Sequence, residues 1–255
     1  KFREVNTYCD AVTVLRRGQL IGTKPTSELD NDMMAEMMVG RRETRTVVER
    51  EARAPGKEVL KLEGLSVADN VGQLAVEELA LDIRAGEIVG VAGVSGNGQR
   101  ELVEALAGQR DVEAGKMLVH GEVYTATRPE MVRHKVACLP EEPLRNACVA
   151  DMSVAENIAL RSFDRPPSSS NGIWLKRGPM RDTARKLIEA YKVKTPGPDA
   201  AIRGLSGGNV QRAVLARELA PDPTPPRLLI VANPCFGLDF QATAEIHARL
   251  RAARD

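Results

Sequence analysis

The sequence predicts an α/β fold with a mostly parallel central sheet. Two short apolar runs, residues 88–92 and 228–231, have the composition of buried strands. The first run leads into a glycine-rich turn and then a helix, which is the order of elements that a phosphate-binding loop requires. A second glycine pair, Gly207 and Gly208, precedes a helix with an apolar stripe. Strands and helices that alternate in this way are typical of an α/β domain.

The first part of the chain predicts a small hairpin and a helix. Residues 10–23 have the pattern of two strands around an Arg-Gly turn. A helix is then predicted from Thr26 or Ser27 to Met38, and Gly40 is expected to end it.

A change of composition then marks a boundary. Residues 43–57 are rich in Glu and Arg and include Pro55 and Gly56, which is typical of a linker. The sequence therefore divides into a first segment, residues 1–42, and a larger domain, residues 58–255.

The glycine-rich turn has the spacing of a phosphate loop and lacks its side chains. It consists of Gly93, Val94, Ser95, Gly96, Asn97, Gly98, Gln99 and Arg100. Gly93 and Gly98 fit the pattern G-x-x-x-x-G-K-[ST], so backbone N–H groups can surround a phosphate. Gln99 stands where the pattern has Lys, and Arg100 stands where a hydroxyl would bind Mg²⁺. We expect weak or altered nucleotide binding at this loop.

The second glycine pair lies in a motif suited to phosphate contact. The motif residues are Leu205, Ser206, Gly207, Gly208, Asn209 and Gln211. Adjacent glycines let the backbone approach a phosphate, Ser206 offers a hydroxyl, and the helix that follows presents free N–H groups. Ser-Gly-Gly also suits an ordinary turn before a helix, and the phosphate loop upstream favours the phosphate interpretation.

Together these motifs resemble those of ABC-type ATPases. Residues 205–212 are similar to the signature motif of that family almost letter for letter. Over nearly the whole chain, the sequence resembles the second nucleotide-binding domain of a tandem ATPase from the simple-sugar and nucleoside importers. The resemblance implies a P-loop NTPase fold with a mostly parallel sheet, an antiparallel β subdomain, and a helical signature subdomain at about residues 140–220.

The resemblance also assigns the remaining site positions. In the family, the apolar strand ends in Asp-Glu-Pro, which holds Mg²⁺ and orients the attacking water; here Ala232 and Asn233 occupy the acidic positions. Loss of a positioned general base typically costs about 10² to 10⁴ in rate, so no catalytic residue is intact in this chain. Glu141 falls at the Q-loop, where Gln is usual, and Asp239 falls at the D-loop.

In this family each ATP lies between the phosphate loop of one domain and the signature of the other. The resemblance therefore implies that this domain supplies its signature in trans to ATP and Mg²⁺ held mainly by a first ABC domain, on the same or another chain. Its own site would bind nucleotide without hydrolysis or stay empty. The implied partners are membrane permease subunits and, indirectly, a solute-binding protein, at the cytoplasmic face of the cell membrane. No residue pattern indicates a resident metal.

By the same resemblance, residues 1–42 are the C-terminal remnant of a first ABC domain, and the second domain stops before its switch histidine. His247, inside a predicted helix over residues 242–253, is expected to be a surface residue.

Composition excludes some classes of function. The net charge of +1 gives no basic patch for nucleic acid, and no apolar run is long enough to span a bilayer. Cys9, Cys138, Cys148 and Cys235 lack metal-ligand spacing and are predicted to be reduced, buried thiols. Trp174 is expected to pack against the helical subdomain.

Three alternatives remain at this point. The missing catalytic residues also suit a nucleotide-sensing or structural pseudo-ATPase, although the complete signature indicates that contact with ATP still matters. An ABC protein that acts on nucleic acid or the ribosome would need basic arms or an interdomain helical hairpin, which the near-neutral charge disfavours. The signature and Gln99 exclude a kinase or GTPase with a phosphate loop.

Overall fold

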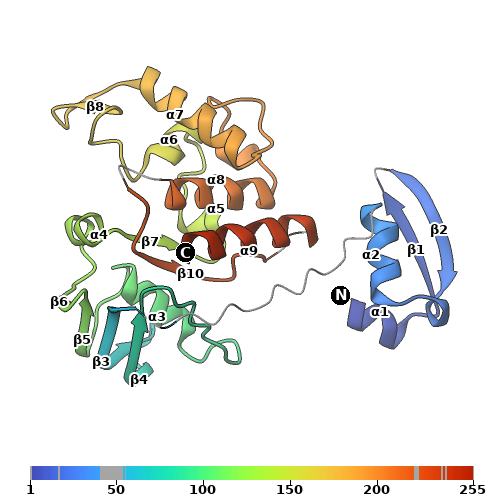
Figure 1. Cartoon of the computed structure of the whole chain (residues 1–255), viewed down its shortest axis with the longest axis horizontal. Helices are drawn as coiled ribbons and strands as arrows, with labels where there is room; N and C mark the ends of the chain where they lie inside the picture. Colours follow the sequence, from blue (N-terminus) through green and yellow to red (C-terminus); the bar gives the residue numbers. More distant parts are fainter. Residues whose placement is uncertain are drawn as a thin grey trace. The chain divides into compact units, whose positions relative to one another are not determined.

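The computed structural model describes residues 2–16, 18–40, 54, 56–220, 224–236, 238 and 240–254. The chain forms two compact units, Lys1–Arg53 and Ala54–Asp255 (Figure 1). Among the described residues, no helix is long and apolar enough to cross a membrane.

The first unit consists of a helix, a hairpin and a second helix. Its elements are α1 (Phe2–Tyr8), β1 (Ala11–Arg16), β2 (Gln19–Pro25), a 3-10 turn η1 (Thr26–Glu28) and α2 (Asn31–Val39). Strands β1 and β2 pair antiparallel, as the sequence predicted. The predicted start of α2 was wrong, because the Asp30 side chain accepts a hydrogen bond from the Met33 N–H at 2.7 Å and caps the helix there. Gly40 ends α2 in the left-handed conformation, at φ 85°.

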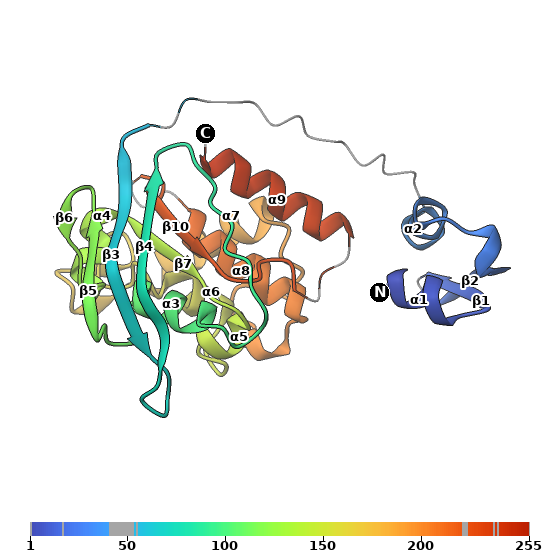
Figure 2. The same cartoon turned by 90° about the horizontal axis from the view of Figure 1, so that it is seen from below.

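The second unit begins with an antiparallel sheet. Strands β3 (Glu58–Ala68), β4 (Leu74–Arg84), β5 (Ala114–Val119) and β6 (Glu122–Val123) are ordered β4-β3-β5-β6. Helix α3 (Gln99–Leu106) packs against β3 and β4, with Leu102, Ala105 and Leu106 buried (Figure 2).

A parallel strand pair and a group of helices form the rest of the unit. The pair is β7 (Val136–Leu139) and β10 (Leu228–Val231). The helices are α4 (Arg128–His134), α5 (Pro143–Asn146), α6 (Val154–Ala159), α7 (Arg177–Ala190), α8 (Gly207–Leu219) and α9 (Phe240–Arg254), with a 3-10 turn η2 (Ile202–Gly204) before α8. A short hairpin, β8 (Ser169–Ser170) and β9 (Trp174–Leu175), lies between α6 and α7.

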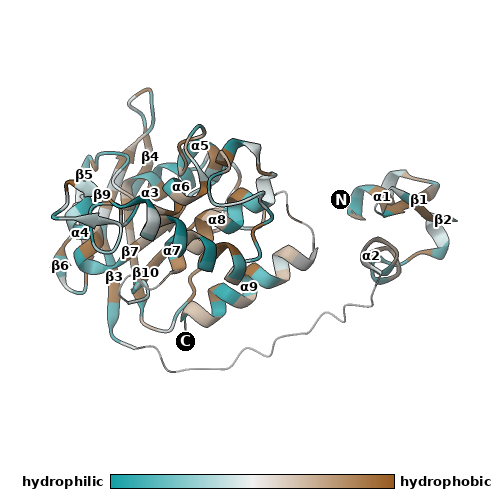
Figure 3. Cartoon of the chain, turned by 90° about the horizontal axis from the view of Figure 1, so that it is seen from above, coloured by the Kyte–Doolittle hydropathy of each residue, from teal (hydrophilic) through white to brown (hydrophobic). Residues whose placement is uncertain are grey.

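The parallel pair separates two hydrophobic clusters. Val136 and Cys138 of β7 belong to the first cluster, with the antiparallel sheet and α3, whereas Leu139 belongs to the second cluster, with α6, α7 and α8. In β10, Ile230 lies in the first cluster and Val231 packs against the second. Strands covered on both faces are apolar throughout, as Figure 3 shows for β7 and β10.

The strand predicted at residues 88–92 is absent. This segment forms no strand, and Ile88, Val89 and Val91 are 55%, 40% and 59% exposed. A strand exists only where a neighbour pairs with its N–H and C=O groups, and no described strand pairs with this segment. The apolar composition of residues 88–92 was therefore not enough to predict a strand.

Two predictions about individual side chains were also wrong. Cys9 is exposed, while Cys138 is buried and Cys148 and Cys235 are half-buried; all four are free thiols. Trp174, the first residue of β9, is 74% exposed and therefore is not packed in the core of the helical part.

Candidate functional site

The carboxyl ends of β7 and β10 bring two site residues together. The strands pair with Val231 opposite Leu139, so Glu141 and Asn233 both follow two residues later at the same edge. The Asn233 Nδ2 donates a hydrogen bond to Glu141 Oε1 at 2.7 Å. In α/β sheets, ligands bind beyond the carboxyl ends of the strands. Of these two residues, Glu141 supplies a carboxylate and Asn233 supplies an amide.

The backbone at Asn233 is strained. Its φ is 43°, in the left-handed region where residues other than glycine are uncommon. Ala232 is half-buried, and its N–H donates to the Leu139 carbonyl at 2.9 Å. The strained turn therefore directs the Asn233 side chain to Glu141 immediately after the strand ends.

The Gln99 side chain fills the glycine loop. Its Nε2 donates to the Val94 carbonyl at 3.2 Å, and its Oε1 accepts from the Asn97 N–H at 3.2 Å. A Cβ added at Gly93 would lie only 2.1 Å from Gln99 Nε2, so the amide rests against the loop backbone. The Asn97 N–H, one of the groups that would otherwise face a phosphate, is thus already in use.

The loop and its helix are held firmly against β4. Gly98 begins α3 with φ 88°, and a Cβ there would lie 2.2 Å from the Ala75 carbonyl oxygen. Only glycine fits this approach. Gly96 has φ 91°, but a Cβ there would meet no atom within 4 Å. Ser95 lies in the exposed turn between Val94 and Gly96.

The Arg100 side chain pairs with Glu104, one turn further along α3. Its Nε pairs with Glu104 Oε1 at 2.7 Å, and Arg110 pairs with the other oxygen of Glu104 at 2.6 Å. The hydrogen bond and charge of Glu104 raise the pKa of Arg100, and the more distant Glu141 adds to the same direction. The Arg100 guanidinium is therefore held along its own helix by Glu104.

The signature lies at the start of α8. Ser206 is the N-cap, and its hydroxyl accepts a hydrogen bond from Asn209 Nδ2 at 2.8 Å and makes no cap bond to the backbone. Ser206 and Gly207 are exposed, and a Cβ at Gly207 would meet nothing within 4 Å. The first N–H groups of a helix have no intrahelical partner. The start of α8 therefore offers a hydroxyl and backbone donors to an anion in solvent or on another molecule.

Contacts within the fold fix the position of the signature. Gln211 is buried, and its Nε2 donates to the Pro234 carbonyl, just beyond β10, at 2.9 Å. Leu205 packs against the second hydrophobic cluster. A Cβ at Gly208 would lie 2.9 Å from Leu238 Cδ2, so glycine lets the two segments touch.

Two further sequence predictions concern Asp239 and His247. Asp239 lies outside the described residues. His247 is exposed on α9, as predicted, with Nε2 3.4 Å from the Cys235 Sγ.

Sequence reasoning missed a buried ion network at the C-terminal end of α8. The Glu218 carboxylate, 1% exposed, pairs with Arg217 at 2.8 Å and with Arg161 at 2.9 Å. It also accepts a hydrogen bond from the Cys138 N–H at 3.3 Å. A helical signal was present, since Glu218 follows Val214 by four positions and Gln211 by seven, which places it on their buried face.

The fold and these motifs define a class of protein. A glycine loop before α3, a parallel strand pair and a Ser-Gly-Gly start to a helix are the parts of an ATP-binding cassette. The model of the family described as "ABC transporter" matches residues 76–235. The chain belongs to this family, whose members generally bind ATP with Mg²⁺ and hydrolyse it.

Particular relatives are import subunits. The chain is 41% identical to the nucleoside import ATP-binding protein NupA of Lactococcus lactis subsp. cremoris over 100% of the chain and 50% of that protein. It is 40% identical to the guanosine import ATP-binding protein NupO of Bacillus subtilis, over 97% of the chain and 48% of that protein. The ribose import ATP-binding protein RbsA of Geobacillus kaustophilus is 32% identical over the same shares. The chain thus spans about half the length of these relatives.

Solved structures show the same fold. A dimeric post-hydrolysis state of the ATP-binding cassette MJ0796, bound to ADP and Pi, matches with a TM-score of 0.63 at 19% identity, covering 77% of this chain and 83% of that one. The structure of cbiO1 from Clostridium perfringens, part of an ABC transporter complex, matches with a TM-score of 0.56 at 21% identity, covering 77% and 74%. The α/β P-loop NTPase fold expected from the sequence is confirmed.

Proposed function

We propose that this chain is part of an ATP-binding subunit of an ABC importer for simple sugars or nucleosides. In this proposal, residues 58–255 are its second ABC domain, residues 43–57 the linker, and residues 1–42 the end of a first domain. The names of the relatives support an import role, since proteins that are 40% to 41% identical to this chain are named for the import of a nucleoside, guanosine or glucose. The subunit would bind membrane permease subunits at the cytoplasmic face of the membrane and work with a solute-binding protein.

The residues of its own loop do not fit ATP with Mg²⁺. The Gln99 amide occupies the loop, Arg100 is held by Glu104, and no acidic residue follows β10 directly. Glu141 is a carboxylate in reach of the strand ends, but the Asn233 amide already uses one of its oxygens. We derive no hydrolysis step at this site, and we propose that it binds nucleotide without turnover or stays empty.

The observation that carries the proposal is the contrast between this filled loop and the open start of α8. Ser206 and Gly207 are exposed, a Cβ at Gly207 would meet no atom within 4 Å, and the Ser206 side chain makes no cap bond to the backbone of the described chain. In the proposal, Ser206, Gly207 and Gly208 contact the γ-phosphate of ATP held by the first domain. A helix N-terminus and its free N–H groups stabilise negative charge there, and Asp239 would help complete that site.

The test uses the full-length tandem protein with its permease in vesicles. Ser206→Arg places a bulky cation at the start of α8 and should lower ATP hydrolysis by at least about tenfold, because a positioned oxyanion donor is worth about that or more. Gln99→Ala, the matched change in the filled loop, should alter hydrolysis less than twofold. The opposite ranking would contradict the assignment of roles.

A second candidate is a non-hydrolytic nucleotide-sensing or structural pseudo-ATPase, which the filled loop favours. It predicts that neither variant changes hydrolysis while Ser206→Arg leaves assembly with the permease intact.

A further inference from the structure

A cavity of about 260 Å³ lies away from the proposed nucleotide site, and the function proposed above does not use it. It is lined by the start of β7, the segment before β10, and helices α4, α6, α7 and α8. The start of β7 is the edge opposite to the carboxyl ends, where Glu141 and Asn233 lie. The cavity therefore lies at the opposite edge of the parallel pair from Glu141 and Asn233.

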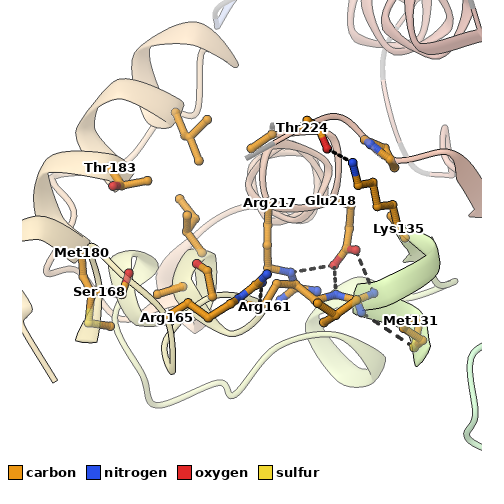
Figure 4. Close-up of a pocket in the computed structure, with 18 of the residues that line it drawn as sticks. Met131, Lys135, Arg161, Arg165, Ser168, Met180, Thr183, Arg217, Glu218 and Thr224 are labelled. Atoms are coloured by element: carbon orange, nitrogen blue, oxygen red, sulfur yellow. Dashed lines mark hydrogen bonds and ion pairs between the residues drawn. The ribbon is translucent and has the colours of Figure 1, made fainter. Parts of the chain in front are cut away.

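The cavity is rich in cations. Its described lining contains the basic side chains of Lys135, Arg161, Arg165 and Arg217, and the acidic side chain of Glu218. Figure 4 shows Arg161 and Arg217 beside Glu218, with Ser168, Met180 and Thr183 across the cavity from them.

Two of these cations, Arg161 and Lys135, have N–H donors that are not used in an ion pair with a described residue. Arg161 pairs with Glu218 through Nη2 and Nε, while among the described residues its Nη1 reaches no better acceptor than the Met131 thioether at 3.9 Å, which is a weak one. Lys135 Nζ donates to the Thr224 hydroxyl and forms no ion pair with any described residue. Glu218 is already shared between Arg161 and Arg217, so one carboxylate serves two guanidinium groups.

The rest of the lining suits a small, water-accessible anion. Ser162, Ser168, Thr183 and Thr224 add hydroxyl groups to the wall. One apolar part of the wall is formed by Ile158 of the second hydrophobic cluster and by Leu187, which packs against that cluster. Another apolar part is formed by Met131 and Val136 of the first cluster. The side chain of Arg161 is 32% exposed, so it is reachable from solvent.

We propose that this cavity binds a small oxyanion, a phosphate or a compact dicarboxylate, between Arg161 and Lys135. Guanidinium and ammonium groups form charge-assisted hydrogen bonds with both kinds of anion. Pockets for drug-sized ligands measure about 300–1,000 Å³, so this volume fits a smaller ligand. An anion here would join Lys135, between α4 and β7, to Arg161, which follows α6, and it would stabilise the packing of the two hydrophobic clusters against each other.

The test measures the thermal unfolding midpoint of the 255-residue chain in inorganic phosphate, in malonate and in chloride at equal ionic strength. Phosphate or malonate should raise the midpoint above the chloride value, because a ligand of the folded state stabilises it. The stronger of the two anions identifies the ligand class. Lys135→Gln and Arg161→Gln should each weaken that effect by at least about tenfold in anion concentration, the loss expected for one charge-assisted hydrogen bond.

Two controls separate this site from others. Arg185→Gln removes an exposed arginine of α7 outside the cavity, and Arg100→Gln removes the cation beside the glycine loop. Both should keep the full effect. If Arg161→Gln fails to fold because Glu218 loses one of its two partners, Lys135→Gln decides the outcome, since the Lys135 ammonium donates to the Thr224 hydroxyl and forms no ion pair with a described residue. Equal midpoints in the three salts, or an anion effect that only Arg100→Gln removes, would overturn the proposal.

Discussion

At the residue scale, the roles of single side chains depend on neighbours that are distant in sequence. Gln99 was recognised from the spacing of the loop as a replacement for lysine, but its insertion into the loop appears only in three dimensions. The pairing of Glu141 with Asn233 follows from the register of β7 and β10, 92 positions apart in the chain. Sequence spacing therefore selected the candidate site residues, and the fold determines what each one touches.

The buried Glu218 network gives a prediction at this scale. Glu218→Gln removes the charge that balances Arg161 and Arg217, and uncompensated buried charges are costly, so the free energy of unfolding should fall by about 3 kcal/mol or more. Glu189→Gln, the same change at an exposed position of α7, should have an effect of less than about 0.5 kcal/mol. Urea denaturation of both variants measures the difference, and equal midpoints would show that the network does not contribute to stability.

At the element scale, the apolar patterns of the sequence predicted α8 and β10 correctly. The apolar stripe predicted for α8 is buried at Val210, Val214 and Leu215, and the predicted strand at residues 228–231 is β10. Residues 88–92 have an equally apolar composition but no paired strand beside them. A helix satisfies its own backbone groups, whereas a strand depends on another segment. This explains why the helix was predicted correctly and one of the two strands was not.

The junction of the glycine loop with α3 provides a matched pair of substitutions. Gly96→Ala and Gly98→Ala both place alanine at a φ near 90°, which costs about 1–2 kcal/mol each. Only Gly98→Ala also drives a Cβ against the Ala75 carbonyl, so it should destabilise the domain further. Chemical denaturation should therefore rank Gly98→Ala well below Gly96→Ala, and a reversed order would contradict the close packing of α3 on β4.

At the scale of the whole molecule, the two hydrophobic clusters meet at β7 and β10. Cys138 lies in β7 within the first cluster, and Cys148 packs against the second. Burial raises the pKa of Cys138 to about 12 and that of Cys148 to about 11. Both folded pKa values lie above the usual value of about 8.5. Folding therefore favours the neutral thiols, and this contribution is complete below about pH 8.5 and is lost as the pH rises towards the folded values.

Thiol labelling tests this view of the core. Near neutral pH, Cys9 is exposed and should react quickly with a maleimide, whereas Cys138 should react only when the domain unfolds, because the thiolate is the reactive form. Mass spectrometry along a urea series should show Cys138 labelling together with the loss of helical circular dichroism. Fast labelling of Cys138 without denaturant would contradict the packing of β7 between the two clusters.

At the scale of the whole molecule, we propose that the chain contributes its signature to another ATP site and does not hold ATP firmly in its own loop. Titration calorimetry with ATP and Mg²⁺ tests this most directly, comparing the chain with Gln99→Lys/Arg100→Ser and with Gln109→Lys as a control for added charge at an exposed glutamine. We expect the unaltered chain and the control to bind ATP weakly or not at all, and the double variant to bind it more tightly. Tight binding of ATP by the unaltered chain would contradict the proposed roles.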